Sequence, residues 1–236
     1  MQRYFVDKKD GFFFFINNED SYHITKVMRM NLNDRVEVVF ENRLYICKIL
    51  DLSDNVKCEI VEEIIKNESQ VPKVIIAQSL VKEQKMDYIL QKCTELNAYK
   101  IIPVNTKRSV VKLSRGDKKL IRWNKILKEA SEQSKRVDIP ILEDITDIKD
   151  LINVKCDCKY ICSVNEKSKT IKSVLSKANK SDTILFVIGP EGGLDPSEEE
   201  FLINNGFIPI TFGEYVLRTE TASLFILSAV NYEFLR

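Results

Sequence analysis

The stretch that decides the fold runs from residue 186 to residue 201 and reads "FVIGPEGGLDPSEEEF". It begins as an apolar run, breaks into Gly-Pro-Glu-Gly-Gly, and then resumes with a pattern typical of a helix. Asp195 can serve as the N-cap, Pro196 as the first helical residue, and Glu198 as the partner in a capping box. Gly206 marks the expected end of this helix. The stretch therefore predicts a strand, a glycine loop and a helix.

Strand-like and helix-like segments alternate along most of the chain, which predicts an α/β domain with a mostly parallel sheet. Strands are expected at residues 71–80, 100–106, 139–142, 159–164, 183–188 and 207–212. Helices are expected at residues 83–96, 117–136, 146–152, 169–177, 197–205 and 219–235. Pro72 marks the best boundary, so we expect one domain at residues 1–70 and a second at residues 73–236.

Residues 1–70 follow a different pattern, in which apolar and polar residues alternate with the period of a half-buried strand. The segment from Arg35 to Leu50 alternates on both sides of a polar turn at 41–43, which predicts a hairpin. The segment from Val56 to Ile64 continues the alternation, and a short helix is expected from Ser21 to Met30. Several short strands that close on themselves predict a small β-barrel.

Composition excludes several classes of protein. The 236 residues are 44% hydrophobic and 30% charged, as in an ordinary folded chain. The apolar run from Phe12 to Ile16 is too short for a membrane span or a signal peptide, so we expect a cytoplasmic protein. Cys156, Cys158 and Cys162 form no CxxC pair, and His23 is the only histidine, so we expect no metal site.

Charge is unevenly distributed along the chain. The net charge is −3 over residues 1–72, +9 over residues 73–138 and −5 over residues 139–236. A basic block of this kind can be a solvated helix face, or it can be a surface that contacts phosphates.

The glycine loop lies where open α/β sheets bind cofactors, beyond the carboxyl end of a strand. The stretch contains neither GxxxxGK[ST] nor GxGxxG, and the acidic turn at 198–200 would repel a phosphate. A cationic or zwitterionic adenosine ligand fits better, because adenine can lie against backbone that only glycine leaves accessible. The alternative is a tight turn that needs positive φ and binds nothing.

A second strand, loop and helix follow at residues 211–225, which read "TFGEYVLRTETASLF". Arg218 and Glu220 lie where this loop enters an otherwise apolar helix. Charges in such a place are costly unless they are paired or used. The sequence therefore marks residues 211–225 as a second functional segment.

Together, "IGPEGGL" at 188–194 and "LRTETA" at 217–222 resemble the paired motifs of the SPOUT superfamily of S-adenosylmethionine-dependent RNA methyltransferases. Within it the chain resembles the ribosomal RNA small subunit methyltransferase E (RsmE) family. The resemblance extends to "HITKVMRM" at 23–30, to the segment at 82–109 and to "EQSKR" at 132–136. Asn97 and Asn31 stand where the family usually has glycine, and asparagine tolerates the left-handed conformation.

The resemblance implies a fold that the local patterns do not predict: a deep C-terminal trefoil knot, preceded by a PUA-like barrel that helps to hold RNA. It implies a homodimer that methylates N3 of a uridine in 16S rRNA with S-adenosylmethionine as cofactor. The implied cofactor-binding residues are Gly189, Glu191, Gly192, Gly193, Phe212, Gly213, Leu217, Arg218, Thr219, Glu220, Thr221 and Ala222.

Catalytic roles remain open at this point. Arg218 is our candidate for organising the reacting groups, and the alternative is a structural ion pair with Glu220 or Glu191. No general base can be identified, although either glutamate could accept the N3 proton or bind the cofactor. His23 is expected to belong to the RNA surface or to be a satisfied surface histidine.

A basic set of residues is expected to contact RNA phosphates. Its members are Lys26, Arg29, Lys82, Lys85, Lys107, Arg108, Lys135 and Arg136. The competing functions are an RNA-binding assembly factor without catalysis, a methyltransferase for another RNA, and a nucleotide-dependent enzyme on a doubly wound sheet. The third is disfavoured by the missing phosphate loop.

Overall fold

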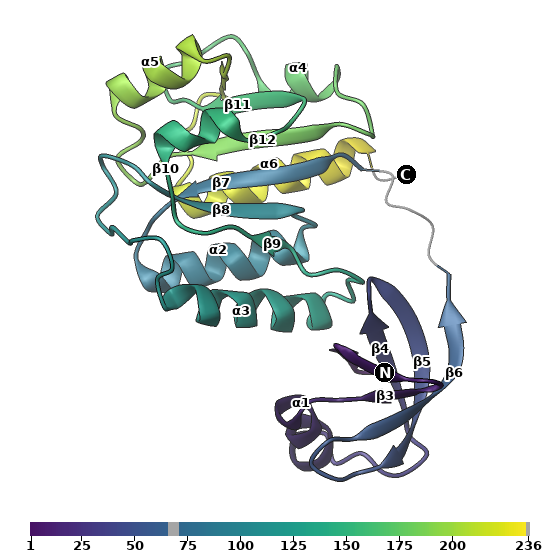
Figure 1. Ribbon diagram of the computed structural model, residues 1–236. Coiled ribbons are helices and arrows are strands. Elements are labelled where there is room, and N and C mark those ends of the chain that lie inside the picture. Colours follow the sequence, from purple (N-terminus) through teal and green to yellow (C-terminus); the bar gives the residue numbers. More distant parts are fainter. Residues whose placement is uncertain (66–70, 235–236) are drawn as a thin grey trace. The chain divides into compact units, whose positions relative to one another are not determined.

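The computed structural model describes residues 1–65 and 71–234, which form two compact units (Figure 1). Within the described residues, the first unit holds 1–65 and 128–139, and the second holds 71–127 and 140–234. The end of helix α3 (Lys119–Gln133), from residue 128 onward, therefore belongs to the first unit, although the other residues of that unit lie far from it in the sequence.

The first unit is built on a six-stranded sheet in the order β1-β4-β5-β6-β3-β2. Its strands are β1 (Arg3–Phe5), β2 (Lys8–Asp10), β3 (Phe13–Phe15), β4 (Arg35–Phe40), β5 (Arg43–Asp51) and β6 (Lys57–Ile64). Within the described residues of this unit, the β1–β4 pairing is the only parallel one. The hairpin predicted at 35–50 is confirmed, and its turn has φ of 48° at Glu41 and 60° at Asn42, as a two-residue type I′ turn requires.

The short helix of this unit differs from the prediction. It begins at α1 (Asn18–Tyr22) and continues directly into one π-helical turn, η1 (His23–Val27). The chain then leaves the helix through Arg29, where φ is 51°. The expected helix end at Met30 is therefore wrong. Asn31, which stands where the family usually has glycine, does not have a positive φ. The left-handed residue that follows Arg29 in the chain is Asn33, with φ of 72°.

The second unit is built on a seven-stranded sheet in the order β10-β8-β7-β12-β11-β13, with β9 beside β8. Its strands are β7 (Lys73–Ser79), β8 (Lys100–Asn105), β9 (Ile141–Leu142), β10 (Thr146–Asp147), β11 (Cys158–Cys162), β12 (Thr183–Ile188) and β13 (Ile208–Ile210). Every pairing is parallel, which confirms the predicted fold class. The short strand β10 was not predicted.

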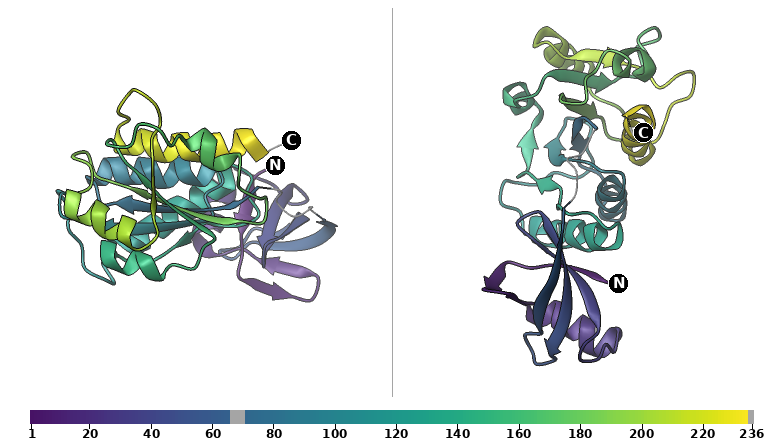
Figure 2. Two further views of the ribbon diagram at one scale, coloured as in Figure 1. Left: turned by 90° about the horizontal axis from the view of Figure 1, so that it is seen from above. Right: turned by 90° about the vertical axis from the view of Figure 1, so that its right-hand side faces the viewer.

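Helices cover both faces of this sheet, with α2 and α6 on one face and α5 on the other (Figure 2). The helices are α2 (Glu83–Glu95), α3 (Lys119–Gln133), α4 (Ile171–Leu175), α5 (Pro196–Asn204) and α6 (Thr219–Phe234). A 3₁₀ helix, η2 (Ile148–Asn153), stands where an α-helix was expected. None of the helices in the described residues is long and apolar enough to cross a membrane.

The local signals around the glycine loop are confirmed. Asp195 caps α5, Pro196 begins it, and Glu198 completes the capping box. Gly206 follows the helix with φ of 86°, and Asn97 ends the α2 segment with φ of 69°. The trefoil knot stays a prediction.

Candidate functional site

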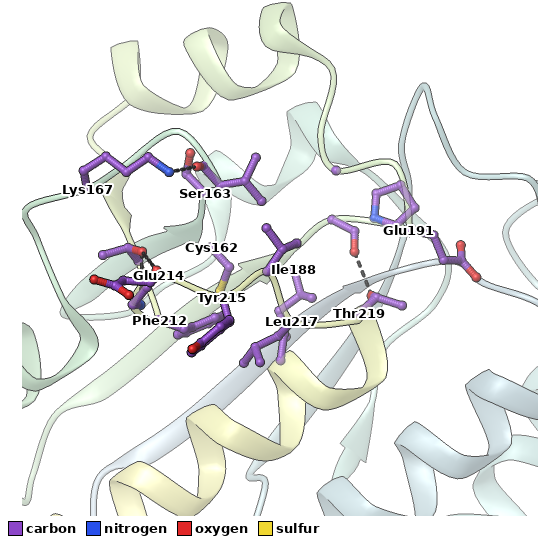
Figure 3. Close-up of a pocket in the computed structure, with 18 residues that line it drawn as sticks. Cys162, Ser163, Lys167, Ile188, Glu191, Phe212, Glu214, Tyr215, Leu217 and Thr219 are labelled. Carbon is purple, nitrogen blue, oxygen red and sulfur yellow. Dashed lines mark hydrogen bonds between the residues drawn. The ribbon is translucent and has the colours of Figure 1, made fainter.

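A pocket opens where the carboxyl ends of β11, β12 and β13 meet the beginning of α6 (Figure 3). Eight of the predicted cofactor-binding residues line it: Gly189, Glu191, Gly193, Phe212, Gly213, Leu217, Thr219 and Ala222. Two segments that lie about 25 residues apart in the sequence therefore form one cavity. This is the edge at which a parallel sheet leaves room for a ligand.

The first wall of the pocket is the loop at 189–195, which is fixed by several hydrogen bonds. Thr219 Oγ1 donates to the Gly189 carbonyl at 2.7 Å, and Arg108 donates to the Gly192 carbonyl at 2.9 Å. A Cβ at Gly189 would lie 2.9 Å from the Leu194 backbone nitrogen, so only glycine fits there. Gly193 has φ of 69° with open space around it, so glycine is favoured there by backbone conformation and not by lack of space.

The second wall is the loop at 213–218, and it is held much less tightly. Gly213 has φ of 114°. Within the described chain, residues 214–217 make no hydrogen bond. Tyr215 and Val216 line the pocket and yet remain 84% and 76% exposed. This wall is therefore only partly fixed by the chain itself.

The third wall was not predicted from the sequence. Cys162 ends β11, Ser163, Val164 and Lys167 follow it, and all four line the same cavity. Ser163 donates to Glu199 Oε1 at 2.5 Å, which ties this wall to α5. A strand had been expected at 159–164, so the rule that ligands lie at carboxyl ends was the signal that could have identified this segment.

A charged cluster lies at the mouth of the pocket. The ammonium of Lys85 on α2 lies 3.0 Å from Glu191 Oε1 and 3.6 Å from Glu220 Oε2. The hydrogen bond from Lys85 is the main cause that holds the pKa of Glu191 below its usual range. Glu220 Oε2 is covered from solvent and has no hydrogen-bond partner within the described residues. The Lys85 ammonium therefore pairs with both carboxylates at the mouth of the pocket.

Arg218 is exposed, and its guanidinium forms no ion pair with any described residue. The structural ion pair considered for Arg218 is not made, because Glu191 and Glu220 both face Lys85 instead. The guanidinium is therefore free to contact a ligand from outside the chain.

Four predicted cofactor-binding residues do not line the main pocket: Gly192, Arg218, Glu220 and Thr221. Glu220 and Thr221 face a shallower hollow between α2 and α6, which is also lined by Gln84, Lys85, Tyr88 and Leu224. Lys85 connects the two cavities, since it lines the hollow and binds the Glu191 carboxylate of the main pocket.

The predicted RNA-contacting residues of the first unit fall into two groups. Lys26 lies on η1 and Arg29 follows it, and both are exposed. Lys135 is partly engaged by Glu37 at 3.4 Å. Arg136 is buried, and its guanidinium binds Asp138 at 2.6 Å, so it cannot present a charge to a phosphate in this state.

In the second unit, Lys82 is exposed where α2 begins. Lys107 and Arg108 are exposed after β8, and both lie near the Asp195 carboxylate, at 3.5 and 3.8 Å. His23 in the first unit lies 3.0 Å from the Tyr4 hydroxyl, so it is a satisfied histidine. In the part of the chain that the structure describes, no three histidine, cysteine or acidic side chains form a metal-binding group.

Comparison with known proteins agrees with this geometry. Residues 67–231 match the RNA methyltransferase domain family, and residues 16–63 match the RNA methyltransferase PUA domain family. The ribosomal RNA small subunit methyltransferase E of Bacillus subtilis is 37% identical and is aligned over 99% of this chain and 97% of its own length. The protein of the same name from Mesomycoplasma hyopneumoniae is 34% identical over 97% and 98%.

A solved structure shares the whole architecture. The ribosomal RNA small subunit methyltransferase E of Neisseria gonorrhoeae, crystallised with bound S-adenosyl methionine, superimposes with a TM-score of 0.88 and is 26% identical. The superposition covers 99% of this chain and 98% of that one. The fold, the paired motifs and the coverage agree, and the chain belongs to the ribosomal RNA small subunit methyltransferase E family.

Proposed function

We propose that this chain transfers a methyl group from S-adenosylmethionine to N3 of a uridine in 16S ribosomal RNA. The observation that carries the proposal is the pocket in which the two motif segments, 189–193 and 212–222, meet at the carboxyl edge of the parallel sheet. The relatives named above are small-subunit ribosomal RNA methyltransferases, and one of them was solved with S-adenosyl methionine.

The pocket fits this cofactor in shape and charge. Gly189, Gly193 and Gly213 expose bare backbone against which adenine can be hydrogen-bonded. Glu191, whose depressed pKa keeps it ionised, can accept the ammonium of the methionine end. The acidic first turn of α5 disfavours a phosphorylated ligand.

S-adenosylmethionine supplies an electrophilic methyl group. The protein must position uracil in line and accept the proton from N3. We propose Glu220 as the acceptor, because Lys85 holds its Oε2 only by an ion pair at 3.6 Å, whereas Glu191 accepts a hydrogen bond from Lys85 at 3.0 Å. Arg218 can donate to a uracil oxygen, where negative charge develops as the proton leaves.

Phosphate contacts are proposed for those residues of the basic set that remain exposed or lie at the pocket mouth: Lys26, Arg29, Lys82, Lys85, Lys107, Arg108 and Lys135. Arg136 is left out, since it is buried and bound to Asp138. Such contacts position the RNA and do not read its sequence.

We also propose the PUA-like domain at 1–70, the methyltransferase domain at 73–236 and a homodimer. The exposed apolar side chains of Tyr215, Val216 and Phe225, at 84%, 76% and 40%, support a second copy at this surface. We propose a cytoplasmic location as well, because ribosomal RNA is the proposed substrate.

Nucleoside mass spectrometry tests the function. Small-subunit particles are incubated with the protein, with and without S-adenosylmethionine, and their RNA is digested and analysed. We expect 3-methyluridine only when the cofactor is present. If RNA binds without any methylated nucleoside, the assembly-factor function replaces the enzyme, and another methylated nucleoside would reassign the target base.

A further inference from the structure

The first unit carries an aromatic surface that the reaction does not use. The sequence "KKDGFFFF" at 8–15 forms the hairpin of β2 and β3, which pairs through β3 with β6 (Figure 1). Phe14 points inward and is fully buried against Phe40 and Tyr45. Because side chains alternate along a strand, Phe13 and Phe15 lie on the opposite, outer face, where both are only half-buried.

Two lysines share this face. Lys8 and Lys57 stand directly opposite Phe15 on the two neighbouring strands. The Lys57 ammonium lies 3.9 Å from the Phe13 ring centre and 5.9 Å from that of Phe15, and the Lys8 ammonium lies 5.2 Å from the Phe15 ring centre. We call this surface the β3 platform, and it consists of Phe13, Phe15, Lys8 and Lys57.

No ion pair neutralises the lysines of the β3 platform within the described residues, although Asp10 and Glu59 stand opposite Phe13 on the same face. Among the described residues, neither Lys8 nor Lys57 forms an ion pair or a side-chain hydrogen bond, and their contacts are with the aromatic rings. The nearby carboxylate of Glu59 is engaged by Lys48 at 3.5 Å. Phe12, at the tip of the hairpin, adds a further ring that is 76% exposed. Rings and unpaired cations therefore lie together on one accessible strand face.

We propose that the β3 platform binds single-stranded RNA, with unstacked bases on Phe13 and Phe15 and backbone phosphates at Lys8 and Lys57. This inference rests on the proposed function, since it concerns RNA around the target. Bases stack on aromatic side chains without strict sequence preference, and cations beside the rings track the backbone. The lysine stems are flexible, so an ammonium can move from the ring face to an adjacent phosphate.

The test measures affinity of the full-length protein for a labelled, uridine-rich single-stranded RNA by fluorescence anisotropy. Phe13→Leu combined with Phe15→Leu keeps an apolar cover on the sheet but removes the aromatic faces. We expect about tenfold weaker binding, as the loss of stacking for one or two bases predicts. Tyr232→Leu, which changes an 89% exposed aromatic residue in the other unit, is the matched control and should bind as the wild type does.

Salt dependence tests the cations separately. Lys8→Gln combined with Lys57→Gln should lower the slope of log affinity against log salt by about 1.4, because two phosphate contacts are lost. Lys48→Gln, on the same sheet but paired with Glu59, should leave the slope unchanged. The proposal is overturned if the leucine variant binds within twofold of wild type, or if the slope does not change. A platform that instead mediates self-association would show a shift in sedimentation and no change in RNA affinity.

Methyl transfer by the wild type is measured in the same preparation, so the two proposals can fail separately. Transfer to small-subunit RNA with unchanged RNA affinity in the leucine variant would keep the function and remove the platform. Weakened RNA binding in that variant, with no transfer by the wild type, would keep the platform and remove the function.

Discussion

Two loops form opposite walls of one pocket, and the chain fixes them to very different degrees. The loop at 189–195 is tied by Thr219, Arg108 and the capping box of α5. The loop at 213–218 makes no hydrogen bond through residues 214–217 within the described chain, and it exposes Tyr215 and Val216. The first loop is thus preformed, while the second lacks contacts that would hold it.

The difference indicates separate tasks for the two loops. A preformed backbone loop binds a ligand without a cost for ordering, so the loop at 189–195 is suited to hold the cofactor. The loop at 213–218 ends at Arg218, whose guanidinium has no ion pair among the described residues, and the order of this loop is expected to come from a ligand or a second copy. The predictions below test this division.

The largest effect is expected at Arg218. We expect Arg218→Lys to keep the fold and the cofactor affinity but to lower methyl transfer about a hundredfold or more, as when a donor to developing charge is removed. Lysine keeps the charge but lacks the planar fork of donors that can hold uracil. Single-turnover transfer to small-subunit particles at saturating cofactor is the measurement.

Arg115→Lys is the control for this variant, because Arg115 is also exposed and its pair with Asp150 lies outside the pocket. It should transfer at the wild-type rate. A rate within a few-fold of wild type for Arg218→Lys would reject Arg218 as a catalytic residue.

A smaller effect, on cofactor binding, is expected at Gly193. Its φ of 69° disfavours a β-branched residue, so Gly193→Val should distort the preformed loop and weaken S-adenosylmethionine binding at least tenfold. Gly116→Val is a matched control, since Gly116 has φ of 71° and equally open surroundings but does not line the pocket.

Both glycine variants should lose similar stability in chemical denaturation, while calorimetry with S-adenosylmethionine should separate them. Equal cofactor affinities in the two variants would show that the loop at 189–195 does not hold the ligand.

The sequence predicted most of what is local in this site. The capping box of α5, the left-handed Asn97 and the strand before each motif segment are set by neighbouring residues, and all are confirmed. The π-helical turn at His23–Val27 and the 3₁₀ helix η2 were missed, because short helices of different types share similar apolar spacing.

Features that depend on strand order could not be predicted. The wall at 162–167 reaches the pocket only because β11 lies between β12 and β13, and local patterns do not specify that order. The position of Lys85 between Glu191 and Glu220 likewise depends on α2 packing beside α6. The sequence marked Lys85, Glu191 and Glu220 as candidate functional residues, but it did not show that Lys85 pairs with both glutamates.

The smallest effect concerns the tie between Lys85 and the loop at 189–195. In the native protein the hydrogen bond from Lys85 lowers the pKa of Glu191, so the carboxylate stays ionised further into the acid range. In Lys85→Gln that pKa should rise toward its ordinary value, because the ammonium is lost. Cofactor affinity should then change little at pH 7, where Glu191 is ionised in both proteins, and should be lost at a higher pH than in wild type as the solution is acidified. Calorimetric titrations with S-adenosylmethionine across the acid range measure this shift.

Lys92→Gln, on the same helix but paired with Glu95 at 2.8 Å, should follow the wild-type curve. If Lys85→Gln also follows that curve, Lys85 does not control the charge of Glu191, and the first loop keeps its acceptor without help from α2.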